Sequence, residues 1–215
     1  MRNYACPEDE FLQAVAQHTM TVLRDDGVHR HVRFKGPNGN SHWFDLITWP
    51  GSLCIDGDMG THVFRRLDDM FEFFRVDQDW KRDGETLAIN PGYWGEKLQA
   101  ISTYGKYKEF SENCFKNVVK SYFDEWVAEQ QPDDDDKADL WEQIEDDVLS
   151  YLEDGEHAAY EAAMRFNNDG QGFRMEDFWD HNFHEFTFHY VWCCYAIAWG
   201  VKVYDEAKTL EANAA

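Results

Sequence analysis

The chain has 215 residues and a formal net charge of −22, with 42 Asp and Glu against 20 Lys and Arg. Hydrophobic residues make up 43% and aromatic residues 16% of the chain, which is enough for a folded core and excludes a wholly disordered acidic protein. Such a charge repels nucleic acid and anionic lipid and attracts basic surfaces. We therefore expect neither direct nucleic-acid binding nor membrane binding.

The first part of the chain predicts a helix followed by a small antiparallel sheet. Residues 8–18 place apolar side chains on one helical face. Residues 19–67 instead alternate with a period of two and contain Asp-Gly and Pro-Gly turn signals. This stretch predicts an antiparallel β-meander of four or five strands, expected near 19–23, 28–34, 42–49, 52–55 and 61–67.

The remainder of the chain has mostly helical periodicity. Helices are expected at 67–75, 92–104, 110–130, 138–152, 156–167 and 175–210, the last of them broken near Gly200. Within 138–152 the aromatic and aliphatic side chains, Tyr151 included, are expected to face inward. The predicted fold class is α+β, with the small meander at about 19–67 followed by a mostly helical, strongly acidic half. We expect one composite domain over 1–215, with a sheet-containing half at 1–110 and the acidic half at 111–215.

Negative charge is concentrated in that second half. Residues 111–215 carry 25 Asp and Glu against 7 Lys and Arg, and residues 124–156 carry 15 acids with Lys137 as the one base. Carboxylates three or four positions apart on a helix are neighbours on its surface, about 5–6 Å apart, so such a face can imitate a row of phosphates. A well-solvated face that only keeps the protein soluble is the alternative. The candidate partner-binding residues are Glu125, Glu129, Asp133, Asp134, Asp135, Asp136, Asp139, Glu142, Glu145 and Asp146.

A second pattern suggests metal ligands at residues 177–189. The candidate set is Asp177, His181, His184, Glu185 and His189. All but His184 recur every four residues, and on a straight helix His181, Glu185 and His189 would offer nitrogen and oxygen ligands on one face. The pattern is not H-E-x-x-H, and in such an aromatic-rich helix histidines are more often core residues, paired here with Asp177 or Glu185. The acidic runs also lack the spacing of a calcium-binding EF-hand loop. We therefore expect no cofactor and no catalytic residue, with a metal-binding enzyme as an alternative function.

A third pattern is the basic strand predicted at 28–35. Arg30, His31 and Arg33 could bind RNA or a regulatory protein. They could equally form ion pairs with the protein's own acidic half. An RNA-binding or regulator-binding module is therefore the other alternative function.

Several sequence segments resemble accessory proteins encoded by tailed phages and prophages of proteobacteria. The resembling segments are Thr21–Gly27, Asp45–Gly51, Gly57–Thr61, Asp69–Arg75, Asn90–Trp94 and Val191–Ala196. The resemblance carries no catalytic residue. It implies a phage protein that works in the host cytoplasm, and small acidic phage proteins of this kind often resist host defences.

Compartment and function follow from these observations together. The N-terminus lacks the apolar stretch of a signal peptide, and the apolar run at 190–201 is too short to cross a bilayer. Five cysteines without a C-x-x-C pair are typical of reduced thiols, in agreement with the host cytoplasm. We predict a non-enzymatic DNA mimic, such as an anti-CRISPR protein, that inhibits a CRISPR effector or a restriction nuclease. Its partner would be a basic nucleic-acid-binding protein of the host defence, and a homodimer is one permitted oligomeric state.

Overall fold

The computed structural model describes residues 4–37, 39, 41–76, 84–103 and 105–214. The chain forms two compact units: unit 1 comprises residues 1–108 and 186–215, and unit 2 comprises residues 109–185. The expected boundary near residue 110 lies close to the observed one. The expected helical half at 111–215, however, divides between both units, because its last helix belongs with the sheet. The single composite domain stays a prediction.

Unit 1 contains a six-stranded antiparallel sheet whose strands lie in sequence order. This sheet, followed by a mostly helical part, confirms the α+β class. The strands are β1 (Thr19–Asp26), β2 (His29–Lys35), β3 (Phe44–Trp49), β4 (Ser52–Gly57), β5 (His62–Arg65) and β6 (Leu98–Ile101).

The sixth strand replaces much of a predicted helix. The helix expected at 92–104 is wrong beyond its first turn, because α3 (Pro91–Gly95) is short and β6 follows it. Asn90 caps α3 by accepting a hydrogen bond from the Tyr93 N–H at 3.2 Å. The strand β6 then pairs with the edge of β5, which places Leu98 opposite Phe64. Pairing with a distant strand therefore overrides the local pattern at this place.

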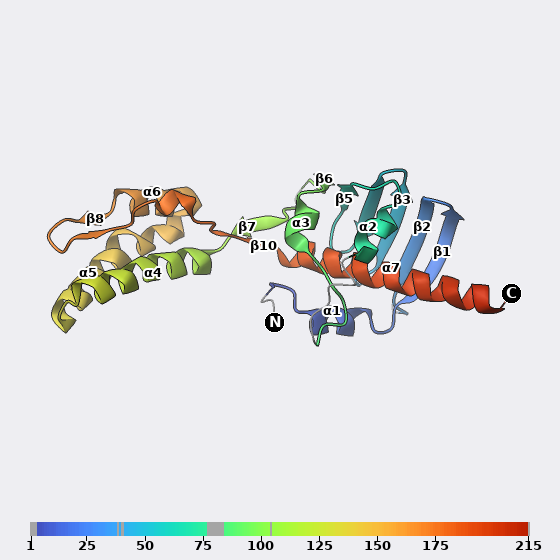
Figure 1. Cartoon of the computed structure of the whole chain (residues 1–215), viewed down its shortest axis with the longest axis horizontal. Coiled ribbons are helices and arrows are strands. Elements are labelled where there is room, and N and C mark those ends of the chain that lie inside the picture. The colour runs from blue at the N-terminus through green and yellow to red at the C-terminus, as the bar shows by residue number, and fades with distance from the viewer. Residues whose placement is uncertain (1–3, 38, 40, 77–83, 104, 215) are drawn as a thin grey trace. The chain divides into compact units, whose positions relative to one another are not determined.

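The longest helix, α7 (Phe188–Ala214), crosses the sheet, and α1 (Glu8–Val15) and α2 (Met70–Val76) pack against it (Figure 1). The predicted break near Gly200 is wrong, since α7 continues through it. A Cβ added at Gly200 would lie 2.8 Å from Leu46 Cδ1 and 3.1 Å from Phe34 Cε2, so this glycine allows the helix to approach the sheet closely. Within the described ranges, α7 included, no helix has both the length and the apolar character needed to cross a membrane.

Unit 2 is a small helical unit with its own aromatic core. Its core joins Phe115, Val119 and Trp126 of the first helix to Leu140 and Ile144 of the next. Its α-helices are α4 (Glu112–Gln130), α5 (Asp134–Asp147) and α6 (Glu156–Arg165), and its 3-10 helices are η2 (Leu149–Asp154) and η3 (Phe178–Asp180). It also contains the short strands β8 (Asn167–Asn168) and β9 (Phe173–Arg174). The strands β7 (Lys108–Phe110) and β10 (His184–Phe186) pair with each other where the chain passes between the two units.

The long helix expected at 175–210 is wrong over its first part. Residues 175–187 form only the short η3 and β10, and Asp177 has a positive φ of 53°, which a continuous helix does not allow. Phe178 and Phe183 are buried in the core of unit 2 with stacked rings 4.9 Å apart. Burial of these two rings, rather than a helical period, determines the path of the segment.

Candidate functional site

Most of the net negative charge belongs to unit 2. Its 77 residues carry 23 Asp and Glu against 5 Lys and Arg, a net charge of −18, whereas unit 1 carries 19 against 15, a net charge of −4. Of the 23 acidic side chains, 22 are exposed and Glu161 is half-buried. The acidic surface is therefore a property of one structural unit and not of the chain as a whole.

All five cations of unit 2 already form ion pairs within it. The pairs are Lys116–Glu112, Lys120–Asp124, Lys137–Asp134, Arg165–Glu161 and Arg174–Asp169. In the described part of the chain the other 18 carboxylates of the unit have no Lys or Arg partner. Exposed ion pairs contribute only about 0–1 kcal/mol each, so these contacts do little for stability. Because all five Lys and Arg residues of unit 2 are in these pairs, the unit has no other Lys or Arg to offset the charge of its remaining carboxylates.

The ten predicted partner-binding residues are all exposed, and all lie on α4, on α5 or at the turn between them. Three also have internal roles. Asp133 caps α5 through its Oδ1, which accepts a hydrogen bond from the Asp136 N–H at 2.9 Å. Glu145 accepts one from Trp141 Nε1 at 2.8 Å, and Asp134 pairs with Lys137 at 3.0 Å. Among the described residues, the other seven carboxylates form no ion pair and accept no hydrogen bond.

Three of those seven form a row along α5. Asp139, Glu142 and Asp146 follow one side of the helix at i, i+3 and i+7, opposite the buried Leu140 and Ile144. Like charges at this spacing cost a few tenths of a kcal/mol each. The acids in the first turn of α5 stabilise the helix through its dipole, which favours negative charge at the N-terminus, and this partly offsets the loss of helix stability from like-charge repulsion. The row can accept hydrogen bonds from Lys and Arg, and it contains no donor for a nucleic acid.

The histidine and acid pattern at 177–189 does not form the predicted row. Glu185 lies in β10 and belongs to unit 2, whereas His189 lies in α7 of unit 1. His181 is exposed next to Tyr122, with its Nε2 2.9 Å from the tyrosine hydroxyl. Within the described ranges no group of three or more His, Cys, Asp or Glu side chains is placed to hold a metal ion. The predicted row is wrong because its spacing argument assumed a continuous helix over 175–187.

The basic strand is neutralised inside unit 1. Arg30 forms a bidentate pair with Asp69, both distances 2.8 Å, and its side chain is only 10% exposed. Asp45 accepts from both Arg33 and His31, each at 2.8 Å. Burial opposes ionisation of Asp45, but the hydrogen bonds from Arg33 and His31 outweigh it and hold its pKa below the usual range. The expected internal ion pairs do form, but their acids belong to the sheet-containing half and not to the acidic half at 111–215, as the alternative had predicted.

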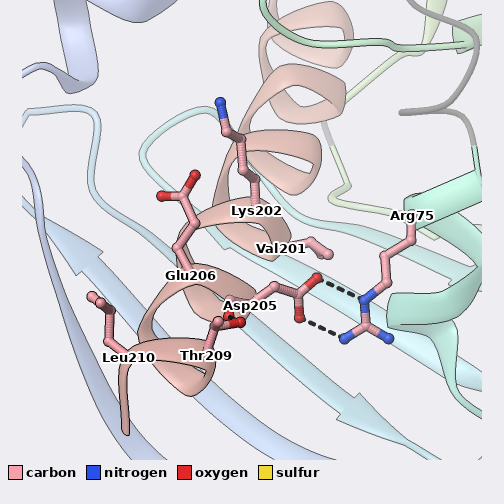
Figure 2. Close-up of a pocket in the computed structure, with 7 residues that line it drawn as sticks. All are labelled: Arg75, Val201, Lys202, Asp205, Glu206, Thr209 and Leu210. Atoms are coloured by element: carbon pink, nitrogen blue, oxygen red, sulfur yellow. Dashed lines mark hydrogen bonds and ion pairs between the residues drawn. The ribbon is translucent and has the colours of Figure 1, made fainter. Parts of the chain in front are cut away.

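A cavity of about 640 Å³ lies along α7 in unit 1 and is also lined by Arg75 of α2 (Figure 2). Arg75 and Asp205 both line it and form a bidentate pair, with both distances 2.7 Å. The remaining lining mixes Lys202 and Glu206 with the apolar Leu210. Its two cations, Arg75 and Lys202, balance its two anions, Asp205 and Glu206, so this lining has no dominant charge and the cavity is a weaker candidate than the acidic surface.

Comparison of the chain with protein-family models, with curated proteins and with solved structures gave no match. The resemblance to phage accessory proteins therefore stays a prediction. The functional argument rests on the charge and geometry of unit 2.

Proposed function

We propose that this protein is a stoichiometric inhibitor that presents unit 2 as a nucleic-acid-like surface to a protein groove built to hold DNA or RNA. One observation carries the proposal: 18 carboxylates of a 77-residue unit lack a Lys or Arg partner among the described residues. A nucleic-acid-binding groove supplies the complementary Lys and Arg. The partner is therefore a basic protein, and the inhibitor competes with nucleic acid for it.

The partner class follows from the predicted phage origin. A phage protein that blocks a nucleic-acid-binding groove of its host gains most from a nuclease that attacks phage DNA or RNA. We therefore place the partner among host-defence nucleases, either a CRISPR effector or a restriction nuclease. This step rests on the resemblance, and the binding chemistry does not depend on it.

The proposal predicts how binding should respond to salt. Exposed charges separated by more than about 8 Å are largely screened at physiological ionic strength. Attraction between an acidic unit and a basic groove accelerates association at low salt and weakens as salt rises. A complex held mainly by apolar contacts would lack this response.

Charge reversal on α5 tests the proposal. The variant Asp139→Lys, Glu142→Lys and Asp146→Lys changes three exposed carboxylates that have no ion-pair partner among the described residues. The measurement is a low-salt pull-down from lysate of a proteobacterial host, with quantitative mass spectrometry of the captured proteins. We expect the unmodified chain to recover a basic nuclease that salt releases, and the variant to lose it while its circular dichroism spectrum is unchanged.

A matched control separates local from global charge. Glu10→Lys, Glu72→Lys and Glu206→Lys change the net charge by the same amount at three exposed positions of unit 1. The proposal expects this control to keep the partner. Equal recovery by both variants, or equal loss, would show that unit 2 is not the binding surface and that its charge serves solubility.

A further inference from the structure

Unit 2 contains a cavity beside its acidic surface that the charge argument does not use. It has a volume of about 410 Å³ and lies between the segment of α5 and η2 on one side and α6 on the other. Ala158 and Ala162 of α6 belong to its lining and are four positions apart. Because both side chains are small, they leave room for an incoming side chain.

The walls of this cavity combine two aromatic residues, Tyr151 and Phe166, with carboxylates. Tyr151 of η2 is 44% exposed. Asp147 contributes an exposed carboxylate from α5, and Glu161 contributes a half-buried one from α6. Arginine suits such surroundings, since its guanidinium binds carboxylates with fixed geometry and stacks on aromatic rings. Its aliphatic stem can lie along small apolar side chains.

An arginine of the protein itself already uses part of this chemistry. Arg165, which also lines the cavity, places its Nη2 3.1 Å from Glu161 Oε2. The Arg165 side chain is 77% exposed, so this pair is weak and an incoming guanidinium can replace it. Glu161 Oε1 also lies 3.6 Å from Nε2 of the exposed His157, so an incoming guanidinium competes with two exposed side chains for this carboxylate.

We infer that this cavity receives one arginine side chain of the basic partner, which fixes the position of the acidic surface on that partner. The inference rests on the proposed function and adds a preference for arginine over lysine at one place. Arginine residues buried in interface pockets contribute a large share of binding energy in many complexes. The long-range electrostatic attraction of unit 2 acts equally on arginine and lysine. A preference for arginine therefore reports binding in the cavity and not general attraction to the acidic surface.

The test uses oligo-arginine and oligo-lysine peptides of equal length, with binding to the full-length chain measured by fluorescence anisotropy at low salt. We expect the arginine peptide to bind more tightly. Tyr151→Ala should weaken its binding about fivefold, the effect of losing a cation–π contact of about 1 kcal/mol. Tyr151→Phe should keep the affinity because the ring remains. If circular dichroism shows that the Tyr151→Ala variant is unfolded, Tyr151→Leu replaces it, because leucine also removes the aromatic ring.

Two matched controls come from the same unit. Trp179 is 55% exposed and does not belong to the cavity lining, so Trp179→Ala should leave the peptide preference unchanged. Arg165→Ala and Arg174→Ala remove the same charge, but Arg174 pairs with Asp169 outside the cavity lining. We expect only Arg165→Ala to increase the ratio of arginine to lysine affinity, because it removes the competing guanidinium from Glu161.

The outcomes distinguish the inference from the proposed function. Equal binding of both peptides, unaffected by Tyr151→Ala, would overturn the inference that the cavity binds arginine. It would leave the proposed function of the acidic surface unchanged. An equal loss for both peptides in Tyr151→Ala would also overturn it. If neither peptide binds at low salt, both the inference and the proposed function are wrong.

Discussion

Acid pH should destabilise unit 1 through one buried histidine. His62 of β5 is only 2% exposed, and neither ring nitrogen has a hydrogen-bond partner among the described residues. Its ring lies 5.5 Å from that of Tyr190. Burial, reinforced by the nearby His189, lowers the pKa of His62 from 6.5 to about 4. The folded chain therefore keeps this imidazole neutral over a pH range in which the unfolded chain protonates it.

The sign and size of the effect follow from linkage. Between pH 6.5 and about 4 the unfolded state binds one more proton at His62, so the free energy of unfolding falls as the pH falls. Each pH unit inside that window costs about 1.4 kcal/mol. From pH 7 to pH 5 the loss attributable to His62 is about 2 kcal/mol, because the window opens only near 6.5.

The assay compares the unmodified chain with His62→Leu at pH 7 and pH 5. Hydrogen-exchange mass spectrometry of peptides from β4 and β5 during urea unfolding reports the stability of unit 1 alone. We expect the unmodified chain to lose about 2 kcal/mol more than the variant over this change in pH. His157→Leu, in unit 2, should behave as the unmodified chain does in these peptides. The same loss in His62→Leu and in the unmodified chain would refute the reasoning.

Three further outcomes are expected. Gly200→Ala should destabilise unit 1 by about 1–3 kcal/mol in urea unfolding, because the added Cβ meets Leu46 and Phe34, although alanine favours a helix; a neutral effect would contradict the close approach of α7 to the sheet. Arg30→Met should cost about 3–5 kcal/mol in the same measurement, since it leaves the largely buried Asp69 without its cation, and a loss below 1 kcal/mol would refute the buried pair. Raising salt to about 1 M should raise the thermal unfolding midpoint of unit 2 by screening its carboxylates, and no salt dependence would refute strong self-repulsion.

Regular patterns near each other in the sequence predicted much of the fold. Alternation and turn signals over residues 19–67 identified five strands of the sheet, and apolar spacing identified α4 within two residues at its start. The sixth strand was missed because its four residues become a strand only by pairing with β5. The segment at 175–187 was mistaken for helix because its spacing imitates a helical period, whereas Phe178 and Phe183 follow the core of unit 2.

The candidate site was predictable in its charge and not in its shape. The exposure of the ten carboxylates followed from their position opposite the apolar face of each helix. Sequence placed Tyr151 inward on a helix at 138–152, but α5 ends at Asp147. Val148, with φ of −128°, leaves the helical conformation, and Tyr151 is 44% exposed. The cavity beside Tyr151 depends on this break, which no local signal marks.

Competition with nucleic acid for a captured partner tests the central claim most directly. The partner recovered by the pull-down would be loaded with labelled DNA or RNA and titrated with the full-length chain at low and high salt. We expect stoichiometric displacement of the nucleic acid at low salt, much weaker displacement at high salt, and none by the variant with Asp139, Glu142 and Asp146 reversed to lysine. Binding of the chain to the partner without displacement of the nucleic acid would contradict the proposal that unit 2 acts as a nucleic-acid mimic.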